Sequence, residues 1–382
     1  MAFTNPYRTV SRFLVTAPFL LLPSIFAQPA AAAGDGVAGA KGDVYVLSNQ
    51  ASGNSVIVFH RDISGMLSSA GSFATGGSGA GSGADPLGSQ NPVVLSRNEH
   101  FLFAVNAGSD SISAFQVDKD KLVAANTVSS GGTMPVSLTV RGHLLYALNA
   151  GGTPNIAGFT IAPGTGKLTM LQNSMQPLPG GASAAPAQVS FRPGGHALVA
   201  TETGTNLIDT FVLKRDGTPQ PGVEFASSAT TPFGFAFSRA NHVAVVSDAE
   251  GGNKGASELS SYRVKKDGNL VDVTAGVGDT QTAACWVVVA NHGRYAYTSN
   301  TGSGTISSYT VSGRGKLALL DVSAGTGNTP VDMGLSHEGK FLYVRNAGDG
   351  TITGFQVRSD GSLKQVGTIG GLPDGAAGLA AR

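Results

Sequence analysis

The chain of 382 residues carries 54 glycines, only 13% charged residues and a formal net charge of +1. This composition favours an all-β protein with many tight turns, and its single cysteine excludes an internal disulfide. A nearly neutral chain without a basic stripe is not typical of a nucleic-acid-binding protein, so we expect no nucleic-acid partner.

Residues 1–33 have the three parts of a secretory signal. Arg8 and Arg12 form a basic stretch, Phe13–Phe26 is an apolar run, and Ala31–Ala33 forms a small-residue cleavage site. The alternative is an uncleaved anchor, but the apolar run is shorter than the ~20 residues of a membrane-spanning helix. We therefore expect export to the periplasm or the cell exterior, with no membrane span left after signal removal.

After a short linker at residues 34–43, residues 44–382 repeat one pattern seven times. Each copy has four apolar runs of alternating character, separated by turns rich in Gly, Asn and Asp. The copies open about every 45–50 residues, which is the period of a four-stranded propeller blade. The openings are Pro92, Pro135, Pro186, Pro232, Trp286 and Pro330. The sequence therefore predicts one all-β domain, a seven-bladed β-propeller, and we expect a monomer.

An aromatic residue closes the third run of every copy, and we expect these rings to pack between blades. They are Phe59, Phe115, Phe159, Phe211, Tyr262, Tyr309 and Phe355. The first copy lacks its inner run, whereas Leu372–Ala381 repeats an inner run with nothing after it. Because a ring of sheets has to cover its edge strands, we predict that this C-terminal strand pairs into the first blade.

The second run of every copy ends in a polar residue, at the rim where the links enter the inner runs. Ligands of propellers usually bind at this mouth of the channel. The polar ends are Asn49, Asn106, Asn149, Glu202, Asp248, Asn300 and Asn346. Asn before Gly is good turn chemistry in itself, so the asparagines are scaffold on one interpretation. On the other interpretation, Asn106, Asn149, Asn300 and Asn346 bind substrate.

Carboxylates replace asparagine in two consecutive copies, at Glu202 and Asp248, and Asp332 enters the last inner run. These three residues are candidates for the general base and acid of a hydrolase. A divalent cation, calcium-like or magnesium-like, could be held through the carboxylate oxygens of Glu202, Asp248 and Glu250. The alternative is that these carboxylates form a solvated acidic rim with no catalytic or metal-binding role.

Three further residues stand out near the mouth. Gln188 enters the fourth copy and could orient a carbonyl group. Trp286 replaces the usual proline and could stack on a ring-shaped ligand, or could fill a gap between blades. Cys285 has no basic neighbour in the sequence that would form a thiolate, which argues against a nucleophilic role.

The histidines occupy turns on the opposite rim. Six follow the first run of a copy, and His60 follows a third run. The six are His100, His143, His196, His242, His292 and His337. A histidine-dependent triad or a zinc site at the mouth therefore has no histidine to use, and the chain has no G-x-S-x-G elbow.

The repeat resembles the seven-bladed lactonase family, which contains propeller-type 6-phosphogluconolactonases and 3-carboxymuconate cyclases. The likeness covers the whole chain after the leader and is closest at Pro186–Phe211 and Gln281–Tyr309, in a pattern similar to a secreted bacterial branch. Family members carry histidine and arginine in their inner strands, whereas the inner runs here contain neither. The resemblance therefore implies the fold, while a phosphorylated sugar lactone would lack its expected anchor.

The first functional hypothesis is hydrolysis of a small lactone by carboxylate- or metal-assisted attack of water at the mouth. One alternative is a non-catalytic exported propeller that binds a small molecule, a glycan or a protein. Another is a cycloisomerase acting on a muconate-type lactone. Converging carboxylates would favour an enzyme, and an asparagine-rich mouth would favour a binding protein.

Overall fold

The fold is taken from a computed structural model, which describes residues 42–119, 121–238 and 242–382. The expected signal at residues 1–33 and nearly all of the expected linker lie outside these residues. The ranges that are described include no helix with the length and apolar character of a membrane span.

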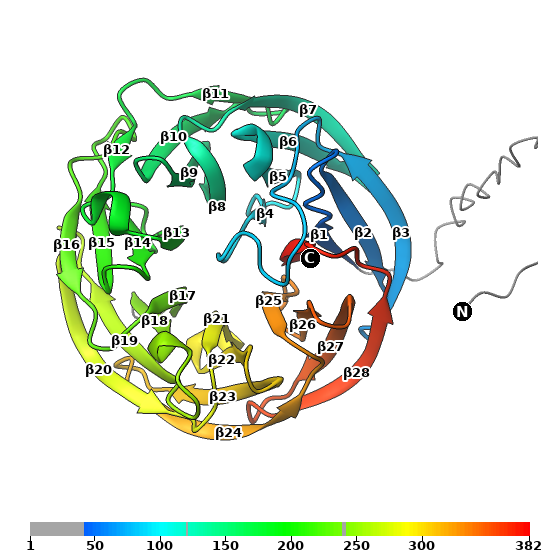
Figure 1. The fold of residues 1–382 in the computed structure, drawn as a ribbon, viewed down its shortest axis with the longest axis vertical. Helices are drawn as coiled ribbons and strands as arrows, with labels where there is room; N and C mark the ends of the chain where they lie inside the picture. The colour runs from blue at the N-terminus through cyan, green and yellow to red at the C-terminus, as the bar shows by residue number, and fades with distance from the viewer. Residues whose placement is uncertain (1–41, 120, 239–241) are drawn as a thin grey trace, which may run out of the picture. The chain divides into compact units, whose positions relative to one another are not determined.

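The described residues form seven antiparallel sheets arranged around a central axis (Figure 1), as the repeat predicts. Blade 1 contains β29 (Ala377–Ala381), β1 (Gly42–Leu47), β2 (Ser55–Arg61) and β3 (Leu67–Ala74). Blade 2 contains β4 (Val93–Leu95), β5 (Phe101–Asn106), β6 (Ser111–Asp118) and β7 (Lys121–Ser129). Blade 3 contains β8 (Thr133–Arg141), β9 (Leu144–Gly151), β10 (Asn155–Ile161), β11 (Leu168–Met170) and β12 (Gln176–Pro177).

The remaining four blades each take four consecutive strands. Blade 4 contains β13 (Pro186–Phe191), β14 (Ala197–Glu202), β15 (Leu207–Val212) and β16 (Val223–Ala226). Blade 5 contains β17 (Pro232–Ser238), β18 (Val243–Asp248), β19 (Glu258–Val264) and β20 (Leu270–Gly278). Blade 6 contains β21 (Ala284–Ala290), β22 (Tyr295–Asn300), β23 (Thr305–Val311) and β24 (Leu317–Gly325). Blade 7 contains β25 (Pro330–Leu335), β26 (Phe341–Asn346), β27 (Thr351–Val357) and β28 (Leu363–Gly370).

Blade 3 departs from the four-stranded pattern because its outer strand is split. Both β11 and the two-residue β12 pair with β10. Between them the chain turns inward at Ser174, whose hydroxyl is buried and accepts a hydrogen bond of 2.9 Å from the backbone N–H of Gly158. The side chain thus satisfies a backbone group that a continuous outer strand would have paired.

The antiparallel order of each blade defines two rims. The mouth rim holds the turns between second and third strands and the links that enter the inner strands. The basal rim holds the turns between first and second and between third and fourth strands. The six histidines predicted for the basal rim lie there, whereas His60 lies inside β2 rather than after it and pairs with Asp43 at 2.8 Å.

The C-terminal strand closes the ring as predicted. β29 pairs with β1, with Ala381 opposite Val44 and Ala377 opposite Leu47. The guanidinium of Arg382 then donates to the buried carboxylate of Asp43. Because no described disulfide supports the ring, this pairing and the packing between blades have to hold it closed.

The core lies between the blades. All seven aromatic residues that close third strands are buried, as expected for rings packed between neighbouring sheets. The largest cluster joins blades 1 to 4, and smaller clusters join the others. These buried faces fix the blades relative to one another and therefore position the side chains at the mouth.

Candidate functional site at the mouth of the ring

The centre of the mouth is filled by the connection between β3 and β4. We call residues 76–91 of this connection the axial segment, which appears as the light-blue chain entering the centre in Figure 1. Its backbone N–H at Ala80 donates to Asn49 Oδ1 in blade 1 at 2.9 Å. Its carbonyl at Ala84 accepts from Arg345 in blade 7 at 3.3 Å. The segment is thus tied to both blades that meet at the closure.

Gln90 anchors the inner end of the axial segment. Its side-chain amide makes two hydrogen bonds with the backbone of Val287 in blade 6, at 2.8 and 3.0 Å. Its own backbone bonds to Ala187 in blade 4 at 3.0 Å and to the hydroxyl of Ser137 in blade 3 at 2.7 Å. In blade 5, a Cβ on Gly234 would lie 2.2 Å from Gln90 Oε1, so only glycine leaves room there.

A pair of opposite charges lies beside this segment. Asp332 and Arg345 are both buried, and the guanidinium donates to Asp332 Oδ2 at 3.3 Å. The same oxygen accepts the backbone N–H of Gly378 at 2.7 Å, which ties blade 7 to the inner strand of blade 1. Burial raises the pKa of the Asp332 carboxyl, and Arg345 opposes that rise.

Asp85 of the axial segment lies close to this pair and is half-buried. Burial, and then the charge of Asp332, raise the pKa of its carboxyl to about 7, while Arg345 opposes the rise. One oxygen accepts the backbone N–H of Gly88 at 3.1 Å. Asp85 can therefore gain or lose a proton near neutral pH, as a general base or acid has to do.

Trp286 and Cys285 are both part of the wall of the mouth. The indole is 1% exposed, packs edge-on against Phe233 with ring centroids 5.0 Å apart, and donates to the carbonyl of Ser89 at 2.9 Å. This position is that of a gap-filling side chain, the alternative given above. Burial raises the pKa of the Cys285 thiol to about 12, so a thiolate does not form near neutral pH.

The predicted amide ligands are bonded to the scaffold. Gln188 bonds to both backbone groups of Phe235 in the next blade, at 2.6 and 2.9 Å. Three asparagines each donate to a hydroxyl five residues later and to another seven residues later, at 2.8–3.2 Å. These are Asn106 with Ser111 and Ser113, Asn300 with Thr305 and Ser307, and Asn346 with Thr351 and Thr353. Asn149 bonds to Asn155 at 3.0 Å.

In blade 4 two carboxyl groups occupy the corresponding positions. Glu202 takes the place of asparagine, and Asp209 takes the place of the hydroxyl seven residues later. Glu202 accepts the backbone N–H of Gly180 at 3.0 Å and the hydroxyl of Thr205. Burial and the neighbouring Glu202 raise the pKa of Asp209 to about 9, so this carboxyl holds a proton at neutral pH.

Blade 5 places Asp248 at the corresponding position, fully buried, and burial raises its pKa well above the ordinary value. Glu250 instead turns outward and accepts two hydrogen bonds from Thr230, at 2.7 and 2.9 Å. No three His, Cys, Asp or Glu side chains of the described ranges are grouped so that they could hold a metal ion. The structure therefore does not gather Glu202, Asp248 and Glu250 into the expected cation site.

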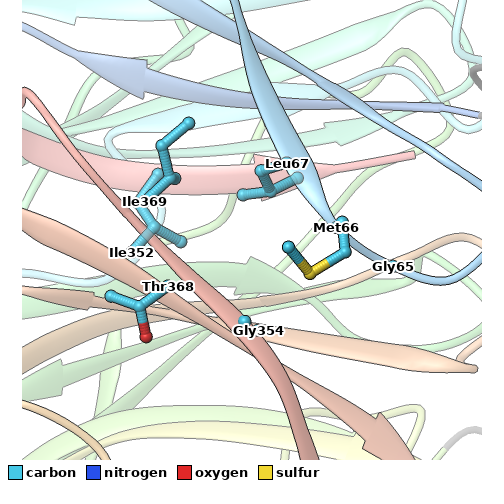
Figure 2. Close-up of a pocket in the computed structure, with 8 residues that line it drawn as sticks. Gly65, Met66, Leu67, Ile352, Gly354, Thr368 and Ile369 are labelled. Carbon is cyan, nitrogen blue, oxygen red and sulfur yellow. The ribbon is translucent and has the colours of Figure 1, made fainter.

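A narrow hollow of about 10 Å³ lies away from the axis, between β3 of blade 1 and β27 and β28 of blade 7. Figure 2 shows Met66, Leu67, Ile352 and Ile369 around it. Thr368 is its polar lining residue, and no titratable side chain lines it. The hollow has room for no more than a water-sized group, and it offers no acid or base.

The sequence prediction missed the axial segment, Asp85 and Arg345. The connection between β3 and β4 is much longer than other links between blades, and that length is the signal that could have revealed it. Arg345 escaped notice because it lies on a second strand, next to the polar end, rather than on an inner strand.

A closed seven-bladed ring with carboxylates and an arginine at one end of its axis defines a propeller with a polar mouth. The family model for the seven-bladed lactonase β-propellers matches residues 44–182 and 251–373. The chain belongs to this family, as the resemblance suggested. The segment between the two matched ranges holds Glu202, Asp209 and Asp248.

Solved structures share the fold at low sequence identity. A protein from Lactobacillus plantarum is 18% identical, with 89% of this chain and 99% of that chain covered and a TM-score of 0.71. A provisionally named 6-phosphogluconolactonase from Bacteroides uniformis is 19% identical, with 89% and 99% covered and a TM-score of 0.68. The periplasmic gluconolactonase of Pseudomonas aeruginosa is 16% identical, with 87% and 98% covered and a TM-score of 0.66. A comparison with curated proteins found no match.

Proposed function

We propose that the protein hydrolyses a small, uncharged lactone at its mouth, with Asp85 as the general base. The observation that carries this proposal is the position of Asp85, half-buried on the axial segment beside the Asp332–Arg345 pair, with a pKa of about 7. Membership in the lactonase family supports the reaction class.

In the proposed reaction, ionised Asp85 takes a proton from a water molecule as its oxygen attacks the lactone carbonyl. The charge that develops on the carbonyl oxygen lies near the positive field of Arg345, which stabilises it. When the ring C–O bond breaks, protonated Asp85 returns the proton to the departing oxygen. The product is an open-chain hydroxy acid, and Asp85 ends the cycle ionised.

The charges at the mouth favour an uncharged substrate. Among the described residues, Lys254 and Arg345 are the only lysine and arginine on the mouth side, and Arg345 is already paired with Asp332. A phosphorylated lactone or a dicarboxylate would meet acidic side chains there without a dedicated cation. Gluconolactone, which the name of the Pseudomonas aeruginosa neighbour includes, is uncharged and is the first lactone to assay.

The test compares the parent protein with Asp85→Asn on a panel of sugar, aliphatic and aromatic lactones. We expect Asp85→Asn to lower kcat/KM by ~10²-fold or more, the usual scale for loss of a general base. In the parent, kcat/KM should rise with pH and level off above about 7, because the ionised carboxylate is the active form. That dependence should disappear in the variant.

Asp349→Asn is the matched control, because Asp349 is an exposed aspartate of the mouth rim that bonds to Asn328 in a neighbouring link. It should keep the parent rate. If no lactone is opened above the buffer rate, or if Asp85→Asn equals the parent, hydrolysis is refuted.

A non-catalytic binding protein is the second candidate. The axial segment fills the centre of the mouth, and the predicted amide ligands Gln188, Asn106, Asn300 and Asn346 already bond to the scaffold. A small molecule or glycan would then bind on the outer surface of the axial segment. Failure of every lactone assay would make this the working hypothesis.

A further inference from the structure

Positive side chains are distributed very unevenly between the two rims. Apart from Lys254 and Arg345, every described Lys and Arg lies in a basal turn or at a strand end next to one. The mouth rim instead carries acids, including Asp85, Asp110 and Asp374. Although the net charge of the chain is near zero, the basal rim is therefore positively charged and the mouth rim negatively charged.

The basal charge is exposed and spread around the ring. Six blades each present at least one exposed lysine or arginine on the basal rim. Examples from blades 2 to 7 in order are Arg97, Arg141, Lys214, Lys266, Arg314 and Lys340. Exposed histidines, such as His143 and His196, lie in the same turns. The basal acids, such as Asp62, Asp216, Asp267 and Asp360, are fewer than the basal lysines and arginines.

The arrangement distinguishes between kinds of anionic partner. A small anion needs several donors that converge, and a linear polyanion needs a stripe or groove that follows its backbone. Charges placed around a whole face instead match a sheet of anionic headgroups, where each Lys or Arg near the surface adds to the attraction. The attraction falls off within a Debye length, so the cations have to lie on one face, as they do here.

We propose that the basal rim docks on an anionic lipid surface and leaves the mouth facing the solution. β1 begins at Gly42 on the basal rim, so the chain that precedes the ring joins it on the docking face. A lactone or other small ligand would then reach the mouth from the aqueous side. This docking does not depend on the proposed hydrolysis.

The test measures co-sedimentation of the protein, purified after export, with lipid vesicles. One set contains phosphatidylcholine alone, and the other also contains phosphatidylglycerol. We expect binding to the anionic vesicles at low salt and its loss at high salt. Neutral vesicles also report any binding through the apolar run Phe13–Phe26, which would not require lipid charge.

The decisive variant combines Lys214→Glu, Lys266→Glu and Lys316→Glu, three exposed lysines in corresponding hairpins of blades 4, 5 and 6. Each lysine near an anionic surface contributes about a factor of five to binding, and the introduced glutamates are repelled, so the triple variant should bind at least about a hundredfold more weakly. Lys254→Glu on the mouth rim is the control and should bind like the parent. Thermal melting confirms that each variant is folded.

Equal binding to neutral and anionic vesicles overturns the proposal, as does parent-like binding by the folded triple variant. Duplex DNA is added as a competing linear polyanion. If DNA binds the parent more tightly than the anionic vesicles do, and the triple variant loses that binding, the face recognises a polymer and docking on lipid is refuted.

Discussion

The carboxyl pair of blade 4 shows how one substitution changes the chemistry of a structural motif. In blades 2, 6 and 7, Asn and Ser or Thr form a neutral donor–acceptor pair. In blade 4, Asp209 could donate to Glu202 only while the Asp209 carboxyl holds a proton. Both side chains are fully buried. Burial and Glu202 raise the pKa of Asp209 to about 9. The motif in blade 4 is therefore sensitive to pH, whereas its neutral counterparts are not.

This difference predicts the pH dependence of stability. An acid whose pKa is higher in the folded than in the unfolded chain binds its proton more tightly when folded. Its contribution to the free energy of unfolding therefore falls as pH rises from about 4, the unfolded pKa, towards about 9. We expect Asp209→Asn to raise the free energy of unfolding by about 1–2 kcal/mol at pH 9 and to leave it nearly unchanged near pH 4.

Urea unfolding at several pH values measures this effect. Asp216→Asn is a suitable control, because Asp216 is exposed and neighbouring hydrogen bonds from Thr218 lower its pKa rather than raise it. The control should show no gain at pH 9. An Asp209→Asn variant that is less stable than the parent at pH 9 would contradict the assignment of a raised pKa to Asp209.

Single residues were predicted with uneven success, for a physical reason. The sequence identified the polar end of every second strand, because strand period and turn chemistry are local. The sequence did not show that the side-chain amides of Asn106 and Asn300 donate to hydroxyls of their own hairpins. The only signal was that these hydroxyls lie five and seven residues after each asparagine. The pKa of Asp85 was beyond prediction, since it depends first on burial and then on Asp332 and Arg345, which lie far away in the sequence.

At the scale of elements, the axial segment joins several blades, whereas an ordinary turn joins only two strands. It contributes little regular structure, yet Gln90 bonds to the inner strands of several blades. We expect Gln90→Ala to lower the free energy of unfolding by about 3 kcal/mol, since two buried backbone groups of Val287 lose their partner and a cavity remains.

Gln116→Ala provides the comparison for that measurement. Its amide also bonds to two backbone carbonyls, of Gly164 and Thr165, but the bonds are exposed to water. We expect an effect within about 0.5 kcal/mol. Equal effects of the two alanine substitutions in denaturant unfolding would show that the axial segment does not stabilise the ring.

Closure of the ring by the C-terminal strand β29 leads to a separate prediction. Deletion of Pro373–Arg382 removes β29 and leaves the edge of β1 unpaired. We expect aggregation or a large loss of thermal stability, measured by size-exclusion chromatography and melting. A truncated protein that melts and elutes like the parent would refute closure through this strand.

Elements were easier to predict than their connections. The openings of the blades at Pro135 or Pro330 and the closure by the last strand followed from the repeat, because every copy offers the same strand pattern. The split outer strand of blade 3 and the inward course of residues 76–91 did not follow. Both depend on contacts with other segments, and a Gly- and Ser-rich stretch carries no periodicity of its own.

At the scale of the whole ring, the sequence predicted the architecture but not the separation of charge between its two faces. That separation follows once each turn is assigned to a rim, since the same lysines that look scattered along the chain then lie on one side. Net charge alone obscures it, because the acids of the mouth rim offset the cations of the basal rim.

The axial segment also has a consequence for the order in which the chain assembles. Gln90 is made early, but its partner Val287 follows 197 residues later, so the central contact has to wait until most blades exist. Contacts between such distant residues form slowly. Until then the segment remains outside any sheet, and its glycines and serines expose little apolar surface that could cause aggregation. The contact that joins the blades at the centre is therefore encoded near the beginning of the ring and made near the end of folding.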